Sequence, residues 1–168
     1  PWNGHGGGEG ILHVREGAMG ARDGSNWTDA FDNIDDALSL AAADATKTNV
    51  WIAGTIVARK AVVSRAVKSA KLEILGGFTG VEDSADERTQ HYSTLDGEDL
   101  QDMVSINNPA DHDVVFERIC FTRGLNRGLN KSGNGAIAIF DCRFLNNGTA
   151  VKGQSGRGVY LVGSSAST

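Results

Sequence analysis

Proline, cysteine, aromatic residues and long hydrophobic runs are all scarce in this chain of 168 residues. Two prolines against 22 glycines indicate tight bends formed by residues with positive φ rather than by proline-fixed turns. The longest nearly apolar run, residues 37–43, is far too short to span a membrane, so no membrane insertion is expected. The formal net charge is −5 and no basic run is present, so nucleic acid is not expected as a partner.

The two cysteines and four histidines offer little material for metal chemistry. Cys120 and Cys142 are not spaced as in a zinc ribbon and the histidines are scattered, so neither a metal nor another cofactor is expected. We expect both thiols to be free, because in the repeat described below Cys142 points inward and Cys120 points the other way. Apolar residues make up 40% of the chain, which suits one folded domain rather than disorder.

Residues 1–10 form a glycine-rich arm, and residues 11–168 are expected to form a single domain that opens with a strand at residues 11–14. A helix is predicted over residues 29–44, because Thr28 suits an N-cap and Asp29 and Asp32 follow it in the first turn. From residue 49 to residue 162, short strands of about four to six residues are each followed by Gly, Asn or Asp. This pattern is typical of either a sandwich or a coil of parallel strands.

A repeat favours the coil. At a constant offset of 23 residues, like residues align in the pairs Val114 and Ile137, Phe116 and Ile139, Ile119 and Cys142, and Phe121 and Phe144. Val159 and Leu161 are expected to continue the column of Ile137 and Ile139. A period in the low twenties with like residues at like positions is typical of a solenoid, here with two strands in each turn.

The segment from Leu72 to Gly80, LEILGGFTG, shows how one turn is expected to bend. Leu72 and Ile74 are predicted to face the interior, Gly76 and Gly77 to form the corner, and Phe78 to face the interior after it. Glycine is expected at this corner because successive turns must stack closely at a sharp bend.

Several segments together resemble a known family: GARDGSNWTDAFDNIDDALSLAA, VWIAGTIV, LEILGGFTGVEDSADERTQHYSTLDGED, VVFERICFTRG and AIFDCRFLNNGTAV. They are similar to the right-handed parallel β-helix domains of secreted and surface-anchored bacterial proteins, the pectin-lyase-like superfold. The resemblance covers roughly residues 11–162 and is most specific from Gly76 to Gly97. It implies an all-β, right-handed parallel β-helix (solenoid) with one N-terminal capping α-helix. It also implies an extracellular or cell-surface location, with the signal sequence absent from the mature chain.

The resemblance does not imply one activity, since relatives include polysaccharide lyases and adhesins. Two acidic clusters are the candidates for catalysis: Asp96, Glu98 and Asp99, and then Asp111, His112 and Asp113. Carboxylates and a histidine that converged in a groove would support acid–base chemistry on a polysaccharide. The alternative, which we favour, is that both clusters are solvated turns whose aspartates bond their own backbone. The first cluster also lacks the ligand spacing of a calcium loop.

Two further patterns receive structural interpretations. Arg118 and Asp141 align in the repeat and are expected to form an ion pair between adjacent turns. Asn26, Asn130 and Asn147 each begin an Asn-x-Ser/Thr triplet, and we interpret them as turn asparagines rather than glycan sites.

Two functions follow from these observations. The first is structural: a solenoid ends in unpaired strand edges that template further pairing unless they are capped. Copies are then expected to join head to tail into a filament or surface layer. The residues expected at this interface are Ile11, Leu12, Val14, Val159, Tyr160, Leu161 and Val162. The alternative is a polysaccharide lyase, hydrolase or carbohydrate-binding module with surface glycans as partners, against which the aromatic content of 7% argues.

Overall fold

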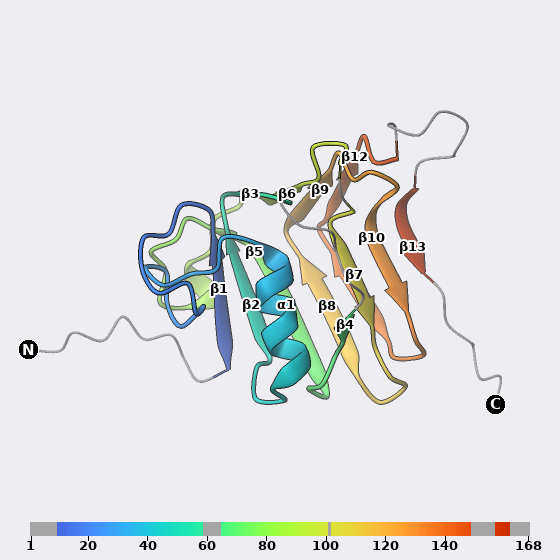
Figure 1. The fold of residues 1–168 in the computed structure, drawn as a ribbon, viewed down its shortest axis with the longest axis horizontal. Helices are drawn as coiled ribbons and strands as arrows, with labels where there is room; N and C mark the ends of the chain where they lie inside the picture. The colour runs from blue at the N-terminus through green and yellow to red at the C-terminus, as the bar shows by residue number, and fades with distance from the viewer. Residues whose placement is uncertain (1–9, 59–64, 101, 149–156, 162–168) are drawn as a thin grey trace, which may run out of the picture.

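The structure, a computed structural model, describes residues 10–58, 65–100, 102–148 and 157–161 (Figure 1). This part of the chain contains the helix α1 (Ile34–Ala43) and the short 3-10 helix η1 (Ala85–Glu87). It also contains thirteen strands: β1 (Ile11–Arg15), β2 (Asn49–Ala53), β3 (Thr55–Val57), β4 (Arg65–Ala66), β5 (Lys71–Phe78), β6 (Ser93–Asp96), β7 (Val104–Asn107), β8 (Asp113–Glu117), β9 (Ile119–Thr122), β10 (Arg127–Ser132), β11 (Ile137–Phe140), β12 (Arg143–Leu145) and β13 (Arg157–Leu161).

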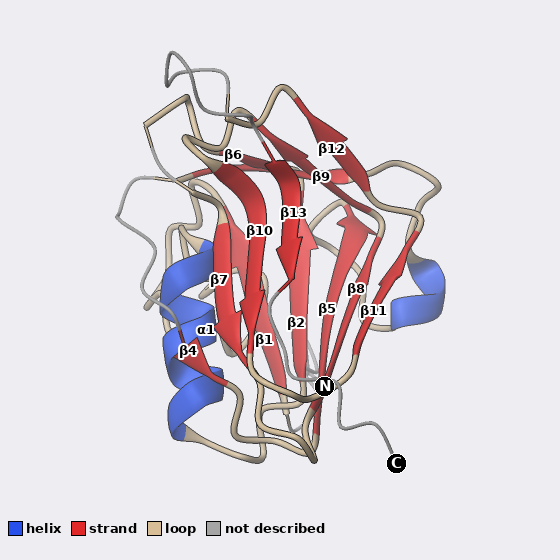
Figure 2. Ribbon diagram, turned by 90° about the vertical axis from the view of Figure 1, so that its right-hand side faces the viewer, coloured by secondary structure: helices blue, strands red, loops and turns tan. Residues whose placement is uncertain are grey.

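The strands form three sheets, and every pairing between them is parallel. Sheet A has the order β1-β2-β5-β8-β11, sheet B the order β12-β9-β6-β3, and sheet C the order β13-β10-β7-β4. From β2 onward the chain visits A, B and C in turn, four times over. Figure 2 looks onto the β13 end and shows the sheets around one interior. The prediction of a predominantly β fold with parallel strands is confirmed. The expected two strands per repeat were wrong, because each passage through the three sheets contributes three strands.

The 23-residue offset predicted the register of the last pair of strands in each of two sheets. Val114 pairs with Ile137 and Phe116 with Ile139 in sheet A, and Phe121 pairs with Phe144 in sheet B. The position of β13 was predicted wrongly: Val159 pairs with Leu129 and Leu161 with Lys131, so the strand belongs to sheet C. Alternating apolar residues show that a strand faces the core but do not show which of three sheets it joins.

The inward side chains of all three sheets fill a single core. Phe116 and Phe121 lie at its centre, fully buried, with ring centroids 5.9 Å apart in an edge-to-face arrangement. Leu72 and Ile74 face this core as predicted. Four residues of α1 pack against its N-terminal end: Ile34, Ala37, Leu38 and Ala41.

Helix α1 begins five residues later than the sequence predicted. Its N-cap is Asn33, whose side-chain oxygen accepts a hydrogen bond from the Asp36 N–H at 2.9 Å. Thr28 is therefore not the cap. The preceding residues cannot be helical, because Phe31 forms a parallel bridge with Val14 and extends sheet A by one residue.

Gly76 and Gly77 lie within β5 and form a bulge rather than a corner. Trp51 pairs with Leu75 and Ala53 pairs with Phe78, so β5 has one residue more than β2 between these two pairs. The extra residue reverses the alternation of side chains, and Phe78 therefore faces the outer side of sheet A. The predicted inward position of Phe78 was wrong. The predicted close approach is present at Gly76. A Cβ atom there would lie 2.2 Å from the carbonyl oxygen of Arg118, the residue that follows β8.

Two other expectations concern the chain's extremities and membranes. Residues 1–9 of the glycine-rich arm lie outside the described residues. Within the described ranges, no helix has the length and apolar character needed to cross a membrane.

Candidate functional site

Asp96, a candidate for catalysis, is tied to an arginine of the next turn. Arg123 donates to Asp96 through Nε at 2.9 Å and through Nη2 at 2.5 Å, and the Glu98 N–H donates to the same carboxylate at 3.0 Å. Burial acts to raise the pKa of Asp96, but the hydrogen bonds and the charge of Arg123 outweigh it, so the pKa is lowered. A carboxylate held ionised in this way serves as an anchor between turns and is poorly suited to donate a proton. The sequence did not single out Arg123.

Asp99 completes the same turn between sheets B and C. Glu98 and Asp99 have positive φ values of 49° and 59°, and the Asp99 N–H donates to the Arg123 carbonyl at 2.8 Å. The backbone forms a tight turn, whereas the carboxylate of Asp96 is bound to Arg123 rather than solvated.

The second acidic cluster lies in the turn that leads from β7 to β8. Asp111 and Asp113 are exposed, and His112 is half-buried with its N–H donating to the Pro109 carbonyl at 3.0 Å. Asn108, fully buried, donates to the His112 carbonyl at 2.8 Å. Strand β7 separates this turn from the turn of Asp96 and Asp99, so the fold does not bring the two candidate clusters together. No group of three or more His, Cys, Asp or Glu side chains that could hold a metal ion occurs within the described ranges.

Both thiols are free, as predicted. Burial raises the pKa of Cys120, and it raises the pKa of Cys142 to about 11. Both groups therefore remain protonated and weakly nucleophilic near neutral pH.

The three asparagines with a glycan-acceptor pattern all use their side chains within the fold. Asn147 follows β12 and is buried, accepting from the Gly124 N–H at 2.8 Å and donating to the Phe121 carbonyl at 3.0 Å. Asn26 accepts from two backbone N–H groups of its own turn. These two are turn asparagines, as interpreted, whereas Asn130 lies within β10 and donates to a serine hydroxyl of β7 at 3.1 Å.

The residues predicted to join copies at the N-terminal end are part of β1. Leu12 and Val14 are 2% and 0% exposed and belong to the core. Ile11 packs against a second buried cluster, which consists of Trp27, Trp51, Ala53, Leu75 and Phe78. None of these three side chains forms an open apolar surface.

The backbone along the outer edge of β1 is also occupied. The His13 N–H donates to the Gly24 carbonyl, the Arg15 N–H donates to the Phe31 carbonyl, and the Phe31 N–H donates to the His13 carbonyl, each at 2.9 Å. The loop of residues 23–31 therefore takes the place that a further strand would occupy. At this edge of sheet A, the loop therefore occupies the backbone hydrogen-bonding positions that another strand would use.

An aromatic cluster fixes the N-terminal loops to the outer face of sheet A. The His13 ring is 2% exposed and lies edge-on to Trp27 and Trp51, at centroid distances of 4.6 and 5.5 Å. Burial lowers the pKa of His13, and the hydrogen bond of its Nδ1 with the Gly24 carbonyl, at 3.0 Å, partly opposes this shift. The indole N–H of Trp27 donates to the Glu82 carbonyl at 2.8 Å. The cluster thus joins the first loop to the loop that follows β5.

The opposite end of the stack is formed by β11, β12 and β13, the last strands of their sheets. No strand in the part of the chain that the structure describes pairs with their outer edges. Four side chains on these strands contact the core but are only partly buried: Ile137, Ile139, Phe144 and Val159. Three more are largely exposed: Phe140 at 57%, Leu145 at 48% and Leu161 at 52%. This apolar surface, the open end, is the candidate functional site.

Polar contacts border the open end. The Arg127 guanidinium lies over the Tyr160 ring, 4.5 Å from its centroid. The predicted ion pair between adjacent turns is present but long, with 4.0 Å between Arg118 Nε and Asp141 Oδ2. Val162, also predicted at this interface, lies outside the described residues.

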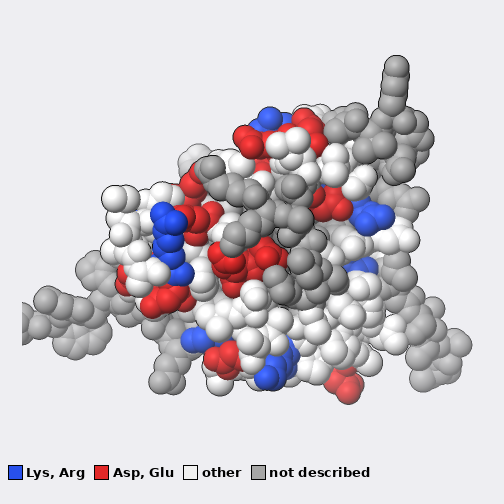
Figure 3. Space-filling model, in the orientation of Figure 1, with Lys and Arg blue, Asp and Glu red and all other residues white. Residues whose placement is uncertain are grey.

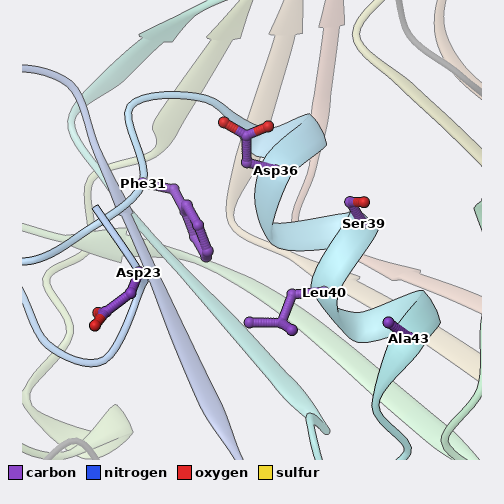
Figure 4. A pocket seen from close by; sticks show the side chains of 6 residues that line it. All are labelled: Asp23, Phe31, Asp36, Ser39, Leu40 and Ala43. Atoms are coloured by element: carbon purple, nitrogen blue, oxygen red, sulfur yellow. The ribbon is translucent and has the colours of Figure 1, made fainter. Parts of the chain in front are cut away.

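A hollow at the N-terminal end of the stack was not predicted from the sequence. It lies between the loop of residues 23–31 and α1 and has a volume of about 470 Å³ (Figure 4). The residues that line it are Asp23, Phe31, Asp36, Ser39, Leu40 and Ala43. Phe31 and Leu40 provide apolar walls, while Asp23 and Asp36 place carboxylates beside them. The helical spacing of residues 36, 39, 40 and 43 was visible in the sequence, but the approach of Phe31 depends on its bridge to Val14.

Comparisons with known proteins do not add a family to this description. No family model, no curated protein and no solved structure matches the chain.

Proposed function

We propose that the chain is a right-handed parallel β-helix of the pectin-lyase-like kind with a structural role, and that copies associate end to end through the open end. The cyclic order of the three parallel sheets supports the solenoid, and crossovers between parallel strands are overwhelmingly right-handed. The proposal places the protein outside the cell, in a filament or surface layer. It assigns no catalytic role or cofactor, and treats the two acidic clusters as turns.

The observation that carries the proposal is the state of the open end. Its inward columns stop at half-buried side chains, and the backbones of β11, β12 and β13 have no strand on their outer side among the described residues. An edge strand of this kind is a template for another chain. Fully burying one large apolar side chain contributes about 1.5–3 kcal/mol, so covering Phe140, Leu145 and Leu161 in one contact would be a substantial gain.

Repetition of such a contact requires that the open end meet a different surface of the next copy. A repeated contact between two unlike surfaces produces a ring if the rotation between copies closes, and a filament if it does not. A contact between two open ends would instead stop at a dimer.

The experiment compares wild type with Leu145→Glu and Leu161→Glu by sedimentation velocity and negative-stain microscopy. We expect wild type to form concentration-dependent polymers and both variants to remain monomeric, because each places a charge in the contact. Leu100→Glu is the matched control: Leu100 is 65% exposed but lies in the turn between β6 and β7, away from both ends. A wild-type protein that stays monomeric at its highest soluble concentration contradicts the proposal.

A further inference from the structure

We infer that the hollow beside α1 is the surface that receives the open end of a second copy, with β13 of one molecule seated against Asp23, Phe31, Asp36 and Leu40 of the next. This inference rests on the proposed end-to-end association and specifies its second surface.

The first support is the distribution of charge along the stack. Residues 16–44 contain seven acidic residues and one basic residue, and the described residues between 118 and 161 contain six basic residues and one acidic residue. The first segment forms the loop and helix at the N-terminal end, and the second begins between β8 and β9 and runs through β13. In Figure 3, acidic atoms gather on the molecule's front face around α1. Two open ends facing each other would repel, whereas an open end facing the N-terminal end of another copy would be attracted.

The second support is the position of the hollow relative to sheet C. Leu38, Ala41 and Ala42 on one side of α1 face Ala66 and Val67, at β4 and just beyond it. The other side of α1 borders the hollow. Helix α1 therefore lies between the hollow and the β4 edge of sheet C, while β13 forms the opposite edge of the same sheet (Figure 1). Stacking two copies along the same axis places β13 of one opposite the hollow of the other.

The third support is the chemistry of the two surfaces. The hollow combines the apolar side chains of Phe31 and Leu40 with two carboxylates. The outer part of β13 presents an exposed Leu161 beside Tyr160, whose ring carries the Arg127 guanidinium at 4.5 Å. Leu161 and Tyr160 would pack against the apolar side chains of the hollow, and Arg127 would pair with one of its carboxylates. Guanidinium–carboxylate hydrogen bonds are strong and directional.

The decisive experiment uses two charge reversals, Asp36→Lys and Arg127→Glu, alone and mixed. Alone, each variant has like charges on both surfaces, and its association should weaken roughly tenfold or more relative to wild type. In an equimolar mixture the lysine hollow meets the glutamate end, and the acidic hollow meets the basic end. The mixture should therefore polymerise in alternation, which also shows that both variants are folded.

Matched controls separate charge and shape at the hollow from general effects. Asp111→Lys reverses an exposed charge in the turn between β7 and β8 and should assemble as wild type does. Ala43→Trp fills the hollow and should block assembly, whereas Ala45→Trp places the same ring on a nearby exposed residue that does not line it.

The outcomes distinguish this inference from the proposed function. If wild type polymerises but Asp36→Lys and Ala43→Trp polymerise equally well, the hollow is not the receiving surface and end-to-end association stands. The same holds if the mixture of reversals fails to assemble although each variant is folded. If wild type is monomeric, the proposed function fails and this inference fails with it.

Discussion

Strands β1 and β11 are the two edges of the same sheet, yet their side chains are buried to very different degrees. In β1 the three central residues are buried, whereas no residue of β11 is. Both strands have an inward apolar face, so their own sequences do not explain the difference. The difference arises because β1 is covered by other parts of the chain: the loop of residues 23–31 runs along its edge and α1 lies beside it. The comparison shows that in a stacked fold the burial of a strand depends on what lies over its outer side.

The two ends of the molecule therefore differ in their capacity to bind another strand. The N-terminal end has its edge hydrogen bonds satisfied and its apolar columns covered, so it resists addition of another strand. The open end retains both a partly exposed core and free edges in the described part of the chain. An assembly of such molecules should therefore grow by side-chain contact at one end and leave the first ladder intact.

The largest expected difference between the covered and the open parts concerns two stacked phenylalanines. Phe121 is 0% exposed, and Phe144 lies over it at 4.8 Å in the last strand of sheet B, partly exposed. Phe121→Ala should lower the free energy of unfolding by about 3–5 kcal/mol, the usual cost in a core. Phe144→Ala should cost about 1–2 kcal/mol, because less of its surface leaves water. Urea denaturation of the monomer measures both.

This pair of variants also tests whether the open end is open in solution. Equal losses for Phe121→Ala and Phe144→Ala at a concentration where the protein is monomeric would show that other residues cover Phe144. The contrast between the ends would then be wrong.

The second prediction concerns the cover itself. Asn33→Ala removes the N-cap of α1 and its bond to the Asp36 N–H, and should cost about 1 kcal/mol of unfolding free energy. Thr28→Ala, at the exposed residue that the sequence indicated as the cap, should change it by less than about 0.5 kcal/mol. Thermal or urea unfolding of the two variants distinguishes a helix capped by Asn33 from one capped by Thr28. A larger loss of stability for Thr28→Ala than for Asn33→Ala would support the longer helix.

These comparisons show what could be predicted from the sequence. The register of β8 with β11 and of β9 with β12 was predictable, because Phe116 and Ile139, and Phe121 and Phe144, are like residues at a fixed offset. Sheet C was not, because its inward column places Lys131 between Ile106 and Leu161 and so breaks the apolar repeat.

The remaining errors concern features whose geometry depends on contacts with residues far away in the sequence. The bulge of Gly76 and Gly77 reverses the side of Phe78, and neither residue shows by itself that β2 has one residue fewer there. The hollow could not be predicted because it forms where a loop folds back along β1.

The third prediction uses pH to weaken only the covered end. Burial holds the pKa of His13 below the ordinary value of 6.5 in the folded protein, whereas the unfolded chain takes up a proton near that value. The stability contributed by neutral His13 is therefore present above 6.5 and is lost as the pH falls below it. The urea midpoint should fall between about pH 7 and about pH 5.5, and less steeply in His13→Phe. The effect should be smaller than that of Asn33→Ala at the upper part of this range, where the unfolded histidine is only partly protonated.

Hydrogen exchange locates this pH effect. Amides of the loop at residues 23–31 should exchange faster in wild type as the pH falls, after correction for intrinsic rates, while amides of β11 and β12 should not respond. A pH dependence that is the same in His13→Phe would mean that another group is responsible.

The smallest expected effect is that of the ion pair at the open end. Arg118 and Asp141 are 4.0 Å apart with side chains 22% and 56% exposed, so water screens their attraction. Asp141→Asn removes the charge but keeps an oxygen that can accept the hydrogen bond of the Tyr92 hydroxyl. A double-mutant cycle with Arg118→Gln should therefore give a coupling below about 0.5 kcal/mol. A coupling well above that in the monomer would mean that the pair is shielded from water, and that the open end is covered in solution. In the polymer the same cycle should give a larger value only if the contact between copies excludes water from Asp141.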